Sequence, residues 1–285
     1  MNNKIAIVIV NYNAGALLQK ALESVHASTH ENIDVVVVDN NSSDTSVEAA
    51  HAVFPEITIL SQKENRGFGA GANTGARYAQ KNGAEYIFFL NPDATISSDT
   101  LEKLLCAARK QKGAFNPTIT NSATQETWFA NGKINFLRMR AEHTTTASHK
   151  GVYETGYATG CALFLRTEDF AKIGFFDESF FLYYEDADLS MRAREKGIKT
   201  FVVSEAQASH EESSTVDEAL KIYHLVLSGL IFFHKHATPA LRIWLSHLLA
   251  LRRIKNSLQN IFFPTEITKA VKRAYHHYGR YHTHY

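Results

Sequence analysis

Residues 86–94 read Tyr-Ile-Phe-Phe-Leu-Asn-Pro-Asp-Ala, an apolar run that ends abruptly at a short polar turn. Five consecutive apolar or aromatic residues are typical of a strand buried on both faces, and Pro92 has no N–H with which to extend it. In an open α/β sheet, ligands bind beyond the strand ends. Asn91 and Asp93 are therefore predicted at such an edge, where they suit a hard divalent cation. The alternative is an Asx turn that caps only its own backbone.

Composition restricts the class of protein. A chain of 285 residues with 45% hydrophobic content can bury a sizeable core. The formal net charge of +1 argues against general nucleic-acid binding. The charge is unevenly placed, because from Pro239 onward eight Lys or Arg residues accompany one acid, a net +7 that leaves −6 for the remainder. We therefore expect the C-terminal stretch to meet an anionic partner.

The cysteine content and the apolar runs bear on the compartment. The two cysteines, Cys106 and Cys161, show neither metal-type spacing nor a disulfide framework, which fits a reducing compartment. The first apolar run, residues 5–10, is too short for a signal peptide. No window approaches the roughly 20 apolar residues of a membrane span. We therefore expect a cytoplasmic protein.

The order of elements predicts the fold class. Apolar strand-like runs at residues 5–10, 35–38 and 57–60 are each followed by a helical pattern before the strand at 86–90. This alternation is expected of an α/β fold with a mostly parallel sheet flanked by helices. Further strands are predicted at 160–166 and 201–203. Between residues 113 and 157 the periodicity fades, and we expect loops there that contribute to a binding site.

Polar residues follow the first two strands directly. Asn11, Tyr12 and Asn13 follow the first, and their amides and aromatic ring are suited to flank a nucleobase; alternatively they form a simple turn in which Asn13 caps the helix. Asp39 ends the second strand at the same edge as Asn91. A role in accepting hydrogen bonds from a base or ribose is favoured for Asp39 over a purely structural one.

A glycine-rich string at residues 67–72 raises the question of a dinucleotide site. The string fits G-x-G-x-x-A, with the carboxylate of Asp93 about twenty residues further on. Six polar residues separate Leu60 from this string, whereas the fingerprint needs its first glycine directly after the strand. A helix start packed close to a ligand or a strand is therefore favoured, with Arg66 and Asn73 as candidate contacts. A nicotinamide-dependent oxidoreductase remains the alternative.

A second acidic segment leads into a predicted helix at residues 186–196 and includes its first turn. The acids of this segment are Asp177, Glu185, Asp186 and Asp188. A carboxylate in a first helical turn is stabilised by about 0.3–1 kcal/mol, which is the purely structural interpretation. The same anion placed in a cleft is able to accept a proton. Asp188 and Arg192 have the spacing of an ion pair, so Asp188 is assigned a structural role.

Together these segments resemble family-two glycosyltransferases of the GT-A fold, and most of all their bacterial rhamnosyltransferase-like branch. The order and spacing of the segments are more specific than any one of them. The resemblance covers roughly residues 4–236 and lies in 9–13, 38–44, 65–69 with Asn73, 91–93, 174–178, 181–190 and 232–236. It implies a nucleotide-sugar-binding and catalytic domain at residues 1–212, followed by a helical, basic extension at 213–285.

The resemblance also implies roles for single residues. Asp93 stands where the family carries its Asp-x-Asp metal motif, with Asn91 in place of the first acid, and His210 falls where some relatives supply a further ligand to Mn²⁺ or Mg²⁺. Asp186 matches the catalytic base, with Glu185 as its neighbour. The candidate nucleotide-binding residues are Asn11, Tyr12, Asn13, Asp39, Asn65, Arg66, Gly67, Phe68, Asn73 and Asn91.

The implied reaction is an inverting sugar transfer from a nucleotide-diphosphate donor to a hydroxyl of a glycan or lipid-linked acceptor. By resemblance to the branch, the donor is dTDP-L-rhamnose and the process is bacterial surface polysaccharide synthesis. A non-catalytic module that binds nucleotides or carbohydrates is a further alternative.

The C-terminal stretch combines a dense apolar run at residues 241–253 with bases at one end. Such a helix suits an anionic membrane interface at the inner face of the cell membrane. Packing on the catalytic body, or on a second subunit of a homodimer, fits the pattern equally well.

Overall fold

A computed structural model describes residues 3–211 and 217–281. The N-terminal half contains β1 (Ile5–Asn11), α1 (Ala16–His26), β2 (Ile33–Asp39), α2 (Ser46–Val53), β3 (Thr58–Ser61), α3 (Phe68–Lys81), β4 (Tyr86–Leu90), β5 (Ala94–Ile96) and α4 (Thr100–Lys110). There follow β6 (Gly113–Asn121), β7 (Thr127–Phe129), β8 (Asn131–Asn135), β9 (Arg140–Thr144), β10 (Val152–Glu154), β11 (Ala162–Arg166), α5 (Thr167–Ile173), α6 (Glu185–Glu195) and β12 (Lys199–His210). The chain ends in α7 (Glu218–His236), α8 (Pro239–Phe262) and α9 (Glu266–Tyr281).

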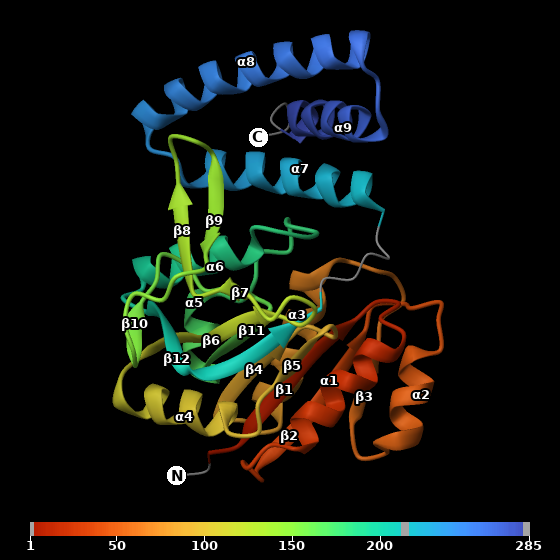
Figure 1. The fold of residues 1–285 in the computed structure, drawn as a ribbon, viewed down its shortest axis with the longest axis vertical. Helices are drawn as coiled ribbons and strands as arrows, with labels where there is room; N and C mark the ends of the chain where they lie inside the picture. Colours follow the sequence, from red (N-terminus) through yellow and green to blue (C-terminus); the bar gives the residue numbers. More distant parts are fainter. Residues whose placement is uncertain (1–2, 212–216, 282–285) are drawn as a thin grey trace.

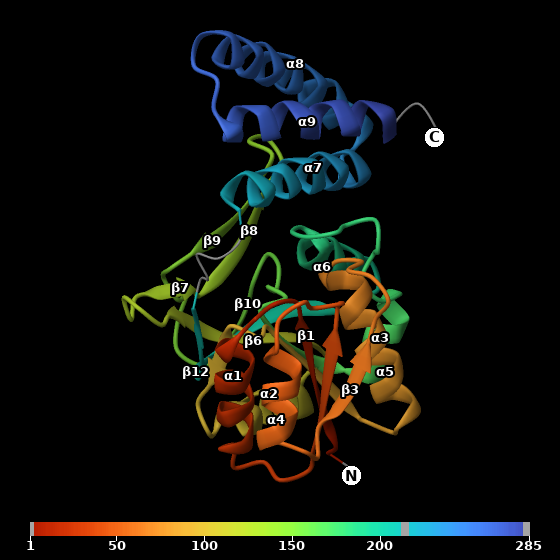
Figure 2. The same ribbon diagram turned by 90° about the vertical axis from the view of Figure 1, so that its right-hand side faces the viewer.

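A large mixed sheet organises the molecule. Within the described residues its strand order is β10-β12-β6-β11-β4-β1-β2-β3, with β5 paired to β12 and β7 to β6. Strands β3, β2, β1 and β4 run parallel, whereas β11 runs antiparallel between β4 and β6. Helices cover both faces (Figures 1 and 2). The predicted α/β architecture with flanking helices is confirmed.

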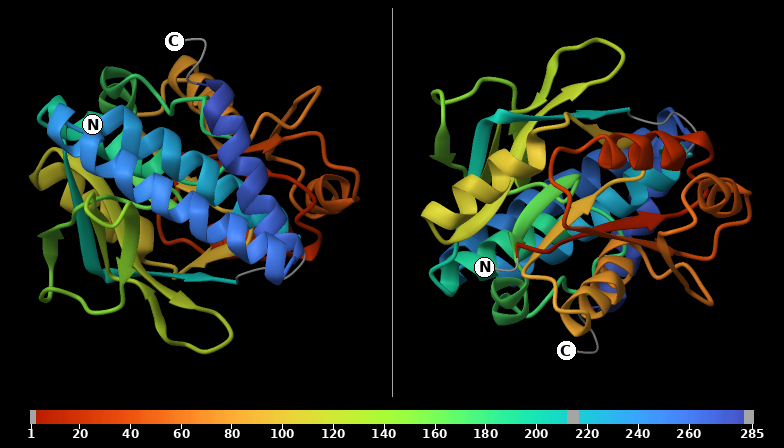
Figure 3. Two further views of the ribbon diagram at one scale, coloured as in Figure 1. Left: turned by 90° about the horizontal axis from the view of Figure 1, so that it is seen from above. Right: turned by 90° about the horizontal axis from the view of Figure 1, so that it is seen from below.

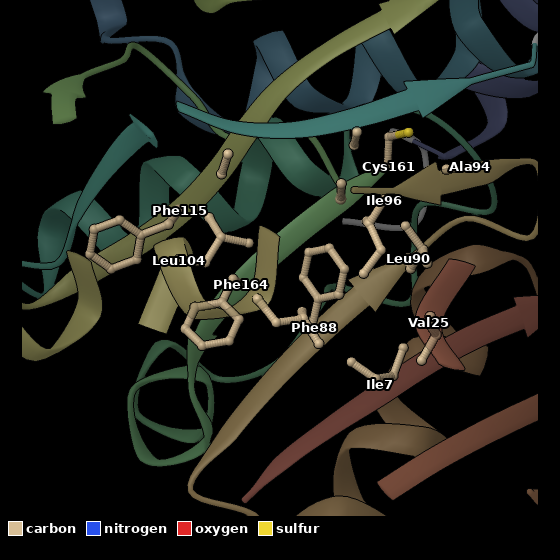
Figure 4. Close-up of a cluster of buried hydrophobic side chains, with 14 of the residues drawn as sticks. Ile7, Val25, Phe88, Leu90, Ala94, Ile96, Leu104, Phe115, Cys161 and Phe164 are labelled. Atoms are coloured by element: carbon tan, nitrogen blue, oxygen red, sulfur yellow. The ribbon is translucent and has the colours of Figure 1, made fainter. Parts of the chain in front are cut away.

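Strand β4 lies at the centre of the core and is buried on both faces, as its sequence predicts. Phe88 packs with Ile7, Phe115 and Phe164 on one side of the sheet (Figure 4). Phe89 packs on the other side, where its ring contacts those of Phe170 and Phe176 at centroid distances of 5.0 and 5.3 Å. Because β4 is held from both sides, its C-terminal end is a fixed point for the residues that follow.

Two expectations about the middle of the chain were wrong. The segment 113–157 contains β6 to β10 rather than only loops, and the strand predicted at 201–203 extends from Lys199 to His210. In β6, Asn116 and Pro117 break the apolar pattern, yet the strand is central because β11 and β12 pair with its two edges. Strand position, rather than local sequence, decides such cases.

The alternative role of Asn13 as the cap of α1 is not observed, because Gly15, with φ of 56°, directly precedes the helix. Asn13 Oδ1 accepts instead from the backbone N–H of Ser43, in the loop after β2, at 2.7 Å. Asn13 therefore ties two loops together rather than beginning a helix.

The three C-terminal helices form a layer above the sheet, with α8 outermost (Figures 1 and 3). The hairpin of β8 and β9 rises from the sheet toward them, and Phe136 at its turn contacts Phe232 and Phe233 of α7. The expected boundary at residues 212 and 213 lies outside the described residues. In the part of the chain that the structure describes, we find no helix with the length and apolarity to traverse a membrane.

Candidate active site

A cavity of about 670 Å³ lies beyond the C-terminal end of β4. It brings together two predicted groups that are far apart in the sequence. Asn91 and Asp93 border it from the β4 turn, and Glu185 and Asp186 border it from the start of α6. His210, at the end of β12, lines it as well. The sequence placed these five residues at one site, and the fold puts them around one cavity.

The β4 turn leaves its side chains free for this cavity. The N–H of Ala94 donates to the carbonyl of Asn91 at 3.1 Å, so a backbone bond closes the turn. The N–H of Asn91 donates to the carbonyl of Cys161 at 2.9 Å and fixes the turn to the loop before β11. These two backbone bonds close and anchor the turn without a contribution from the Asn91 or Asp93 side chain.

Strand pairing places His210 beside Asp93. Strand β12 pairs antiparallel with β5, and His210 stands opposite Ala94 in that register. As a result, His210 Nε2 lies 3.2 Å from Asp93 Oδ1. Asp93 Oδ1 is buried and has no hydrogen-bond partner among the described residues. An orphaned carboxylate oxygen facing an imidazole nitrogen is a fitting half of a divalent-cation site.

The protein supplies only part of such a site. No group of three or more His, Cys, Asp or Glu residues with metal-binding geometry occurs in the described ranges. The remaining coordination positions would fall to the bound diphosphate and to water, which is the usual manner in which Mg²⁺ is held with phosphates.

A loop with a strained backbone directly precedes α6 and positions Asp186 at the start of that helix. Tyr183 and Tyr184 directly before α6 both have left-handed φ angles, 68° and 66°, which cost about 1–3 kcal/mol each. Asp186 Oδ2 accepts from the N–H of Gly160 at 3.0 Å, so the carboxylate is oriented from the loop before β11. Burial raises the pKa of Asp186, and the hydrogen bond from Gly160 opposes the shift. A carboxylate with raised pKa in a cavity is a candidate general base.

Glu185 differs from its neighbour. It is buried, and its Oε2 has no partner within the described part of the chain. Burial, followed by the charge of Asp186, raises the pKa of Glu185 to about 8. The neutral form of Glu185 is therefore favoured, whereas Asp186 keeps a hydrogen bond that favours its anion.

Helix α7 supports this loop from above. Gly229 of α7 packs against the ring of Tyr184, where an added Cβ would lie 3.1 Å from the ring. Ser228 Oγ donates to the carbonyl of Leu182 at 2.8 Å. Asp188, fully buried, accepts from His236 of α7 at 2.8 Å and from Arg192 at 2.7 Å, which confirms the predicted pair.

The residues predicted to read the base lie at the ends of β1 and β2, beside the cavity lining rather than within it. Asn11 is buried and donates to Ser42 and Ser46 at 2.9 Å, and to Asp39 Oδ1 at 3.3 Å. Asn11 thus holds Asp39 and its loop in place. Asp39 remains partly accessible, and Tyr12 is 52% exposed.

The candidates around α3 divide into two groups. Asn73 is buried, bonds to the backbone of Phe176 at 2.9 Å in both directions, and donates to Glu178. Gly67 has φ of 86°, and a Cβ there would lie 2.1 Å from the carbonyl oxygen of Phe181. These two residues hold the 174–184 segment, and their role in nucleotide binding stays a prediction.

The other candidates around α3 are open to a ligand to different degrees. Phe68 lines the cavity. Arg66 is exposed and pairs with Glu178 at 2.8 Å. Asn65 accepts from the N–H of Gly67 at 2.9 Å, which shapes the turn into α3.

Sequence reasoning missed a further part of the lining. The additional side chains come from the 113–157 segment, from the loop before β11, and from α7: Trp128, His143, Tyr157, Thr159, Lys221 and Leu225. A local signal was the Thr159-Gly160 pair shortly before β11, because a glycine there lets the backbone approach the Asp186 carboxylate.

The comparisons with known proteins decide the family. The profile described as Glycosyl transferase family 2 matches residues 6–174, which is more than half of the chain. This chain belongs to glycosyltransferase family 2. It is a glycosyltransferase, and the oxidoreductase alternative is therefore wrong. The glycine string agrees, since β3 ends at Ser61 and the string begins only at Gly67.

Two curated relatives of this glycosyltransferase have rhamnosyltransferase names. The N-acetylglucosaminyl-diphospho-decaprenol L-rhamnosyltransferase of Mycobacterium tuberculosis is 27% identical over 75% of this chain and 78% of its own length. The dTDP-rhamnosyl transferase RfbF of Shigella flexneri is 24% identical over 90% of this chain and 87% of its own length. The family expectation, including the rhamnosyltransferase-like branch, is confirmed.

Solved structures confirm the GT-A fold. TarS of S. aureus, residues 1–349 in complex with UDP-GlcNAc, has a TM-score of 0.61 at 14% identity and covers 95% of this chain and 79% of its own. GalNAc-T7 with UDP, GalNAc and Mn²⁺ has a TM-score of 0.64 at 17% identity, over 79% of this chain and 47% of its own. At these identities the likeness concerns the fold alone.

Proposed function

We propose that this glycosyltransferase is inverting and metal-dependent, and that it moves L-rhamnose from dTDP-rhamnose to a hydroxyl of a glycan or lipid-linked acceptor in bacterial surface polysaccharide synthesis. The observation that carries the proposal is that Asp93 and Asp186 border the same cavity. Cys161 lines the same cavity as these two carboxylates, and burial first, then the charges of Asp93 and Asp186, raises the pKa of its thiol. The rhamnosyltransferase relatives support the choice of sugar.

The donor side is assigned to the ends of β1, β2 and β4. Asp39, positioned by Asn11, accepts hydrogen bonds from the base, and exposed Tyr12 offers a ring beside it. Asn91 and Phe68 border the sugar-diphosphate part of the cavity. Asp39 pairs with Asn11 in the β1–β2 register, so both lie at the C-terminal edge of the parallel strands. The base and the diphosphate would therefore bind along one edge of the sheet.

Asp93 and His210 would hold Mn²⁺ or Mg²⁺, since their facing atoms lie 3.2 Å apart and the carboxylate oxygen is otherwise unpaired. When bound, the ion would neutralise the charge that develops on the diphosphate leaving group. Asp93 directly precedes β5 and His210 ends β12, so β5–β12 pairing fixes the geometry of the pair before any ligand arrives.

Asp186 accepts the proton of the acceptor hydroxyl as that oxygen attacks the anomeric carbon. The N–H of Gly160 holds the carboxylate in place during this step. The bond from the anomeric carbon to the diphosphate oxygen breaks as the new bond forms on the opposite face, so configuration inverts. A single displacement needs one base and no carboxylate nucleophile.

The site of action is assigned to the cytoplasm. Both cysteines are free, with Cys161 buried beside the catalytic cavity and Cys106 exposed on α4. Free thiols of this kind fit a reducing compartment.

The deciding experiment compares Asp186→Asn with Asp93→Asn. We expect Asp186→Asn to bind dTDP with Mn²⁺ as the parent does, measured as a thermal shift, but to lose transfer by about 10²–10⁴-fold. Asp93→Asn should lose the Mn²⁺-dependent part of the shift. Transfer at the parental rate by Asp186→Asn would contradict the base assignment. Binding of dTDP-rhamnose without turnover by the parent, across glycan and lipid-linked acceptors, would favour a non-catalytic module.

A further inference from the structure

The outermost helix, α8, exposes a continuous apolar face. Five aliphatic side chains on it are each 49–71% exposed: Ile243, Leu251, Ile254, Leu258 and Ile261. Their separations of three, four and eight residues place them on one side of the helix. The buried residues of α8, Leu245 and Asn256, face the rest of the molecule. An apolar face of this extent on a surface helix marks an interaction site.

The β8–β9 turn extends this face at the N-terminal end of α8. Trp244, half exposed, donates its indole N–H to the carbonyl of Leu137 at 3.1 Å, and Leu137 is itself 64% exposed. Arg252 donates to the carbonyl of Arg138 at 2.8 Å. The turn is therefore fixed to α8 by two side-chain bonds. An indole with one polar and one apolar side is suited to a membrane–water interface.

A basic pocket lies next to this apolar face. Its volume is about 430 Å³, and Arg253, Lys272, His276 and Arg280 line it between α8 and α9. Arg253 Nε is buried and has no hydrogen-bond partner within the described residues. The one acid of the stretch, Glu266, pairs with Lys269 at 2.8 Å. The pocket thus gathers guanidinium and ammonium groups in a stretch of net charge +7, and such groups suit a phosphate.

We propose that α8 docks on the surface of an anionic phospholipid bilayer. The apolar face inserts at the acyl boundary, and the basic pocket holds the headgroup phosphates. A helix with an apolar face and bases beside it has the composition of an interfacial helix. Charge argues against a second copy as the occupant, because a two-fold contact through this stretch would oppose two surfaces of net charge +7.

Docking would connect the bilayer to the catalytic cavity. Helix α7, on which α9 and α8 pack, contributes Lys221 and Leu225 to the cavity lining. The same helical layer therefore borders both the lipid surface and the acceptor side. This consequence rests on the proposed transfer to a lipid-linked acceptor, whereas the docking itself does not.

The test is co-sedimentation of the full chain with phosphatidylcholine vesicles, with and without phosphatidylglycerol. We expect binding only to the anionic vesicles, weakening as salt is added. The triple variant Leu251→Ser, Ile254→Ser, Leu258→Ser and the double variant Lys272→Glu, Arg280→Glu should each bind at least tenfold more weakly. Matched controls are Val53→Ser, an exposed valine of α2, and Arg109→Glu with Lys110→Glu on α4, which should bind as the parent does.

Three results would overturn the proposal. These are no binding to anionic vesicles, equal binding to neutral ones, or unchanged binding by both the apolar and the charge variants. A dimer that the apolar variant converts to a monomer, without vesicle binding by the parent, would assign the face to a second copy. Vesicle co-sedimentation measures neither nucleotide binding nor sugar transfer. Failure of the docking proposal is therefore distinguishable from failure of the proposed reaction.

Discussion

At the scale of single residues, two adjacent carboxylates have different environments. Asp186 is held by the N–H of Gly160, whereas Glu185 has a buried, unpartnered oxygen. Burial acts on both, and Asp186 accepts from the N–H groups of Gly160 and Ala187, which favour its anion. Adjacent acids with different protonation states are a recurrent way to set one of them as the base.

Glu185→Gln tests this division of roles. Because burial and the charge of Asp186 raise the pKa of Glu185 to about 8, the parent carries a neutral side chain there at pH 7. The amide imitates that state, so we expect transfer at pH 7 within about threefold of the parent, since the base itself is unchanged. Differences should appear only above pH 8, where the parental Glu185 ionises. The check is the pH–rate profile of both proteins, and a loss of a hundredfold at pH 7 would make Glu185 the base.

Asp188 sets the acid stability of the catalytic loop. Burial alone would raise the pKa of Asp188, but the hydrogen bond from His236 and the charges of Arg192 and Lys235 outweigh it and lower the pKa to about 2. An unfolded aspartate titrates near 3.9, so the group contributes about 2–3 kcal/mol above that pH and loses it as the pH falls toward 2.

We therefore expect Asp188→Asn to reduce the free energy of unfolding at pH 7 by about 2–3 kcal/mol. The difference from the parent should shrink below pH 4, as the parental carboxylate becomes protonated. Urea denaturation at pH 7 and at pH 3 measures both values. A difference that is equal at the two pH values would contradict the linkage.

At the scale of elements, α3 lies against the parallel strands through its small residues. A Cβ at Gly75 would lie 2.4 Å from Val8 Cγ1 of β1, and one at Gly71 would lie 2.7 Å from Val10 Cγ1. The glycines of the 67–72 string and its continuation thus allow close helix–sheet packing. This packing fixes the N-terminal end of α3, and with it Phe68, at the cavity.

Gly75→Ala should destabilise the protein by about 1–3 kcal/mol, because the added methyl group overpacks a core that cannot yield. Gly279→Ala in α9 is the matched control, since its Cβ would meet nothing within 4 Å. The control should stabilise by up to about 1 kcal/mol through helix propensity. Thermal or urea unfolding measures both, and equal effects would show that propensity rather than packing dominates.

At the scale of the whole molecule, α7 belongs physically with the catalytic loop. Its Lys235 and His236 contact Asp188, and its Phe232 and Phe233 contact Tyr184. A unit consisting of residues 1–212 would lose all of these contacts. The division of the chain into domains at residues 212 and 213 thus remains a proposal. It can be tested by measuring the stability of residues 1–212 alone.

We expect residues 1–212 alone to be markedly less stable than the full chain. Removing α7 leaves the buried Asp188 with only Arg192 and exposes the apolar ring of Tyr184. Breaking a buried ionic network of this kind costs about 3–5 kcal/mol. The measurement is thermal unfolding of the two chains side by side. An unchanged melting temperature would establish 1–212 as an independent domain.

The sequence by itself determined the elements whose patterns are local. The strands at β1, β2 and β4 are continuous apolar runs that stop at polar residues, and a run of this kind is identifiable without knowing its neighbours. Asp93 was found for the same reason, because it lies at the abrupt end of its strand, whereas Asp186 was singled out among four nearby acids by the family resemblance. The order of these segments along the chain also identified the family.

Only the tertiary structure decided which side chains meet. His210 lies beside Asp93 because of the β5–β12 register, and Asn11 and Asn73 form buried hydrogen bonds that hold neighbouring loops in place. The same holds for β6, which is a central strand because of its neighbours, and for α7, which lies over the catalytic loop. The physical reason is that register and burial are set by pairing between segments distant in the chain, and local sequence patterns contain no information about that pairing.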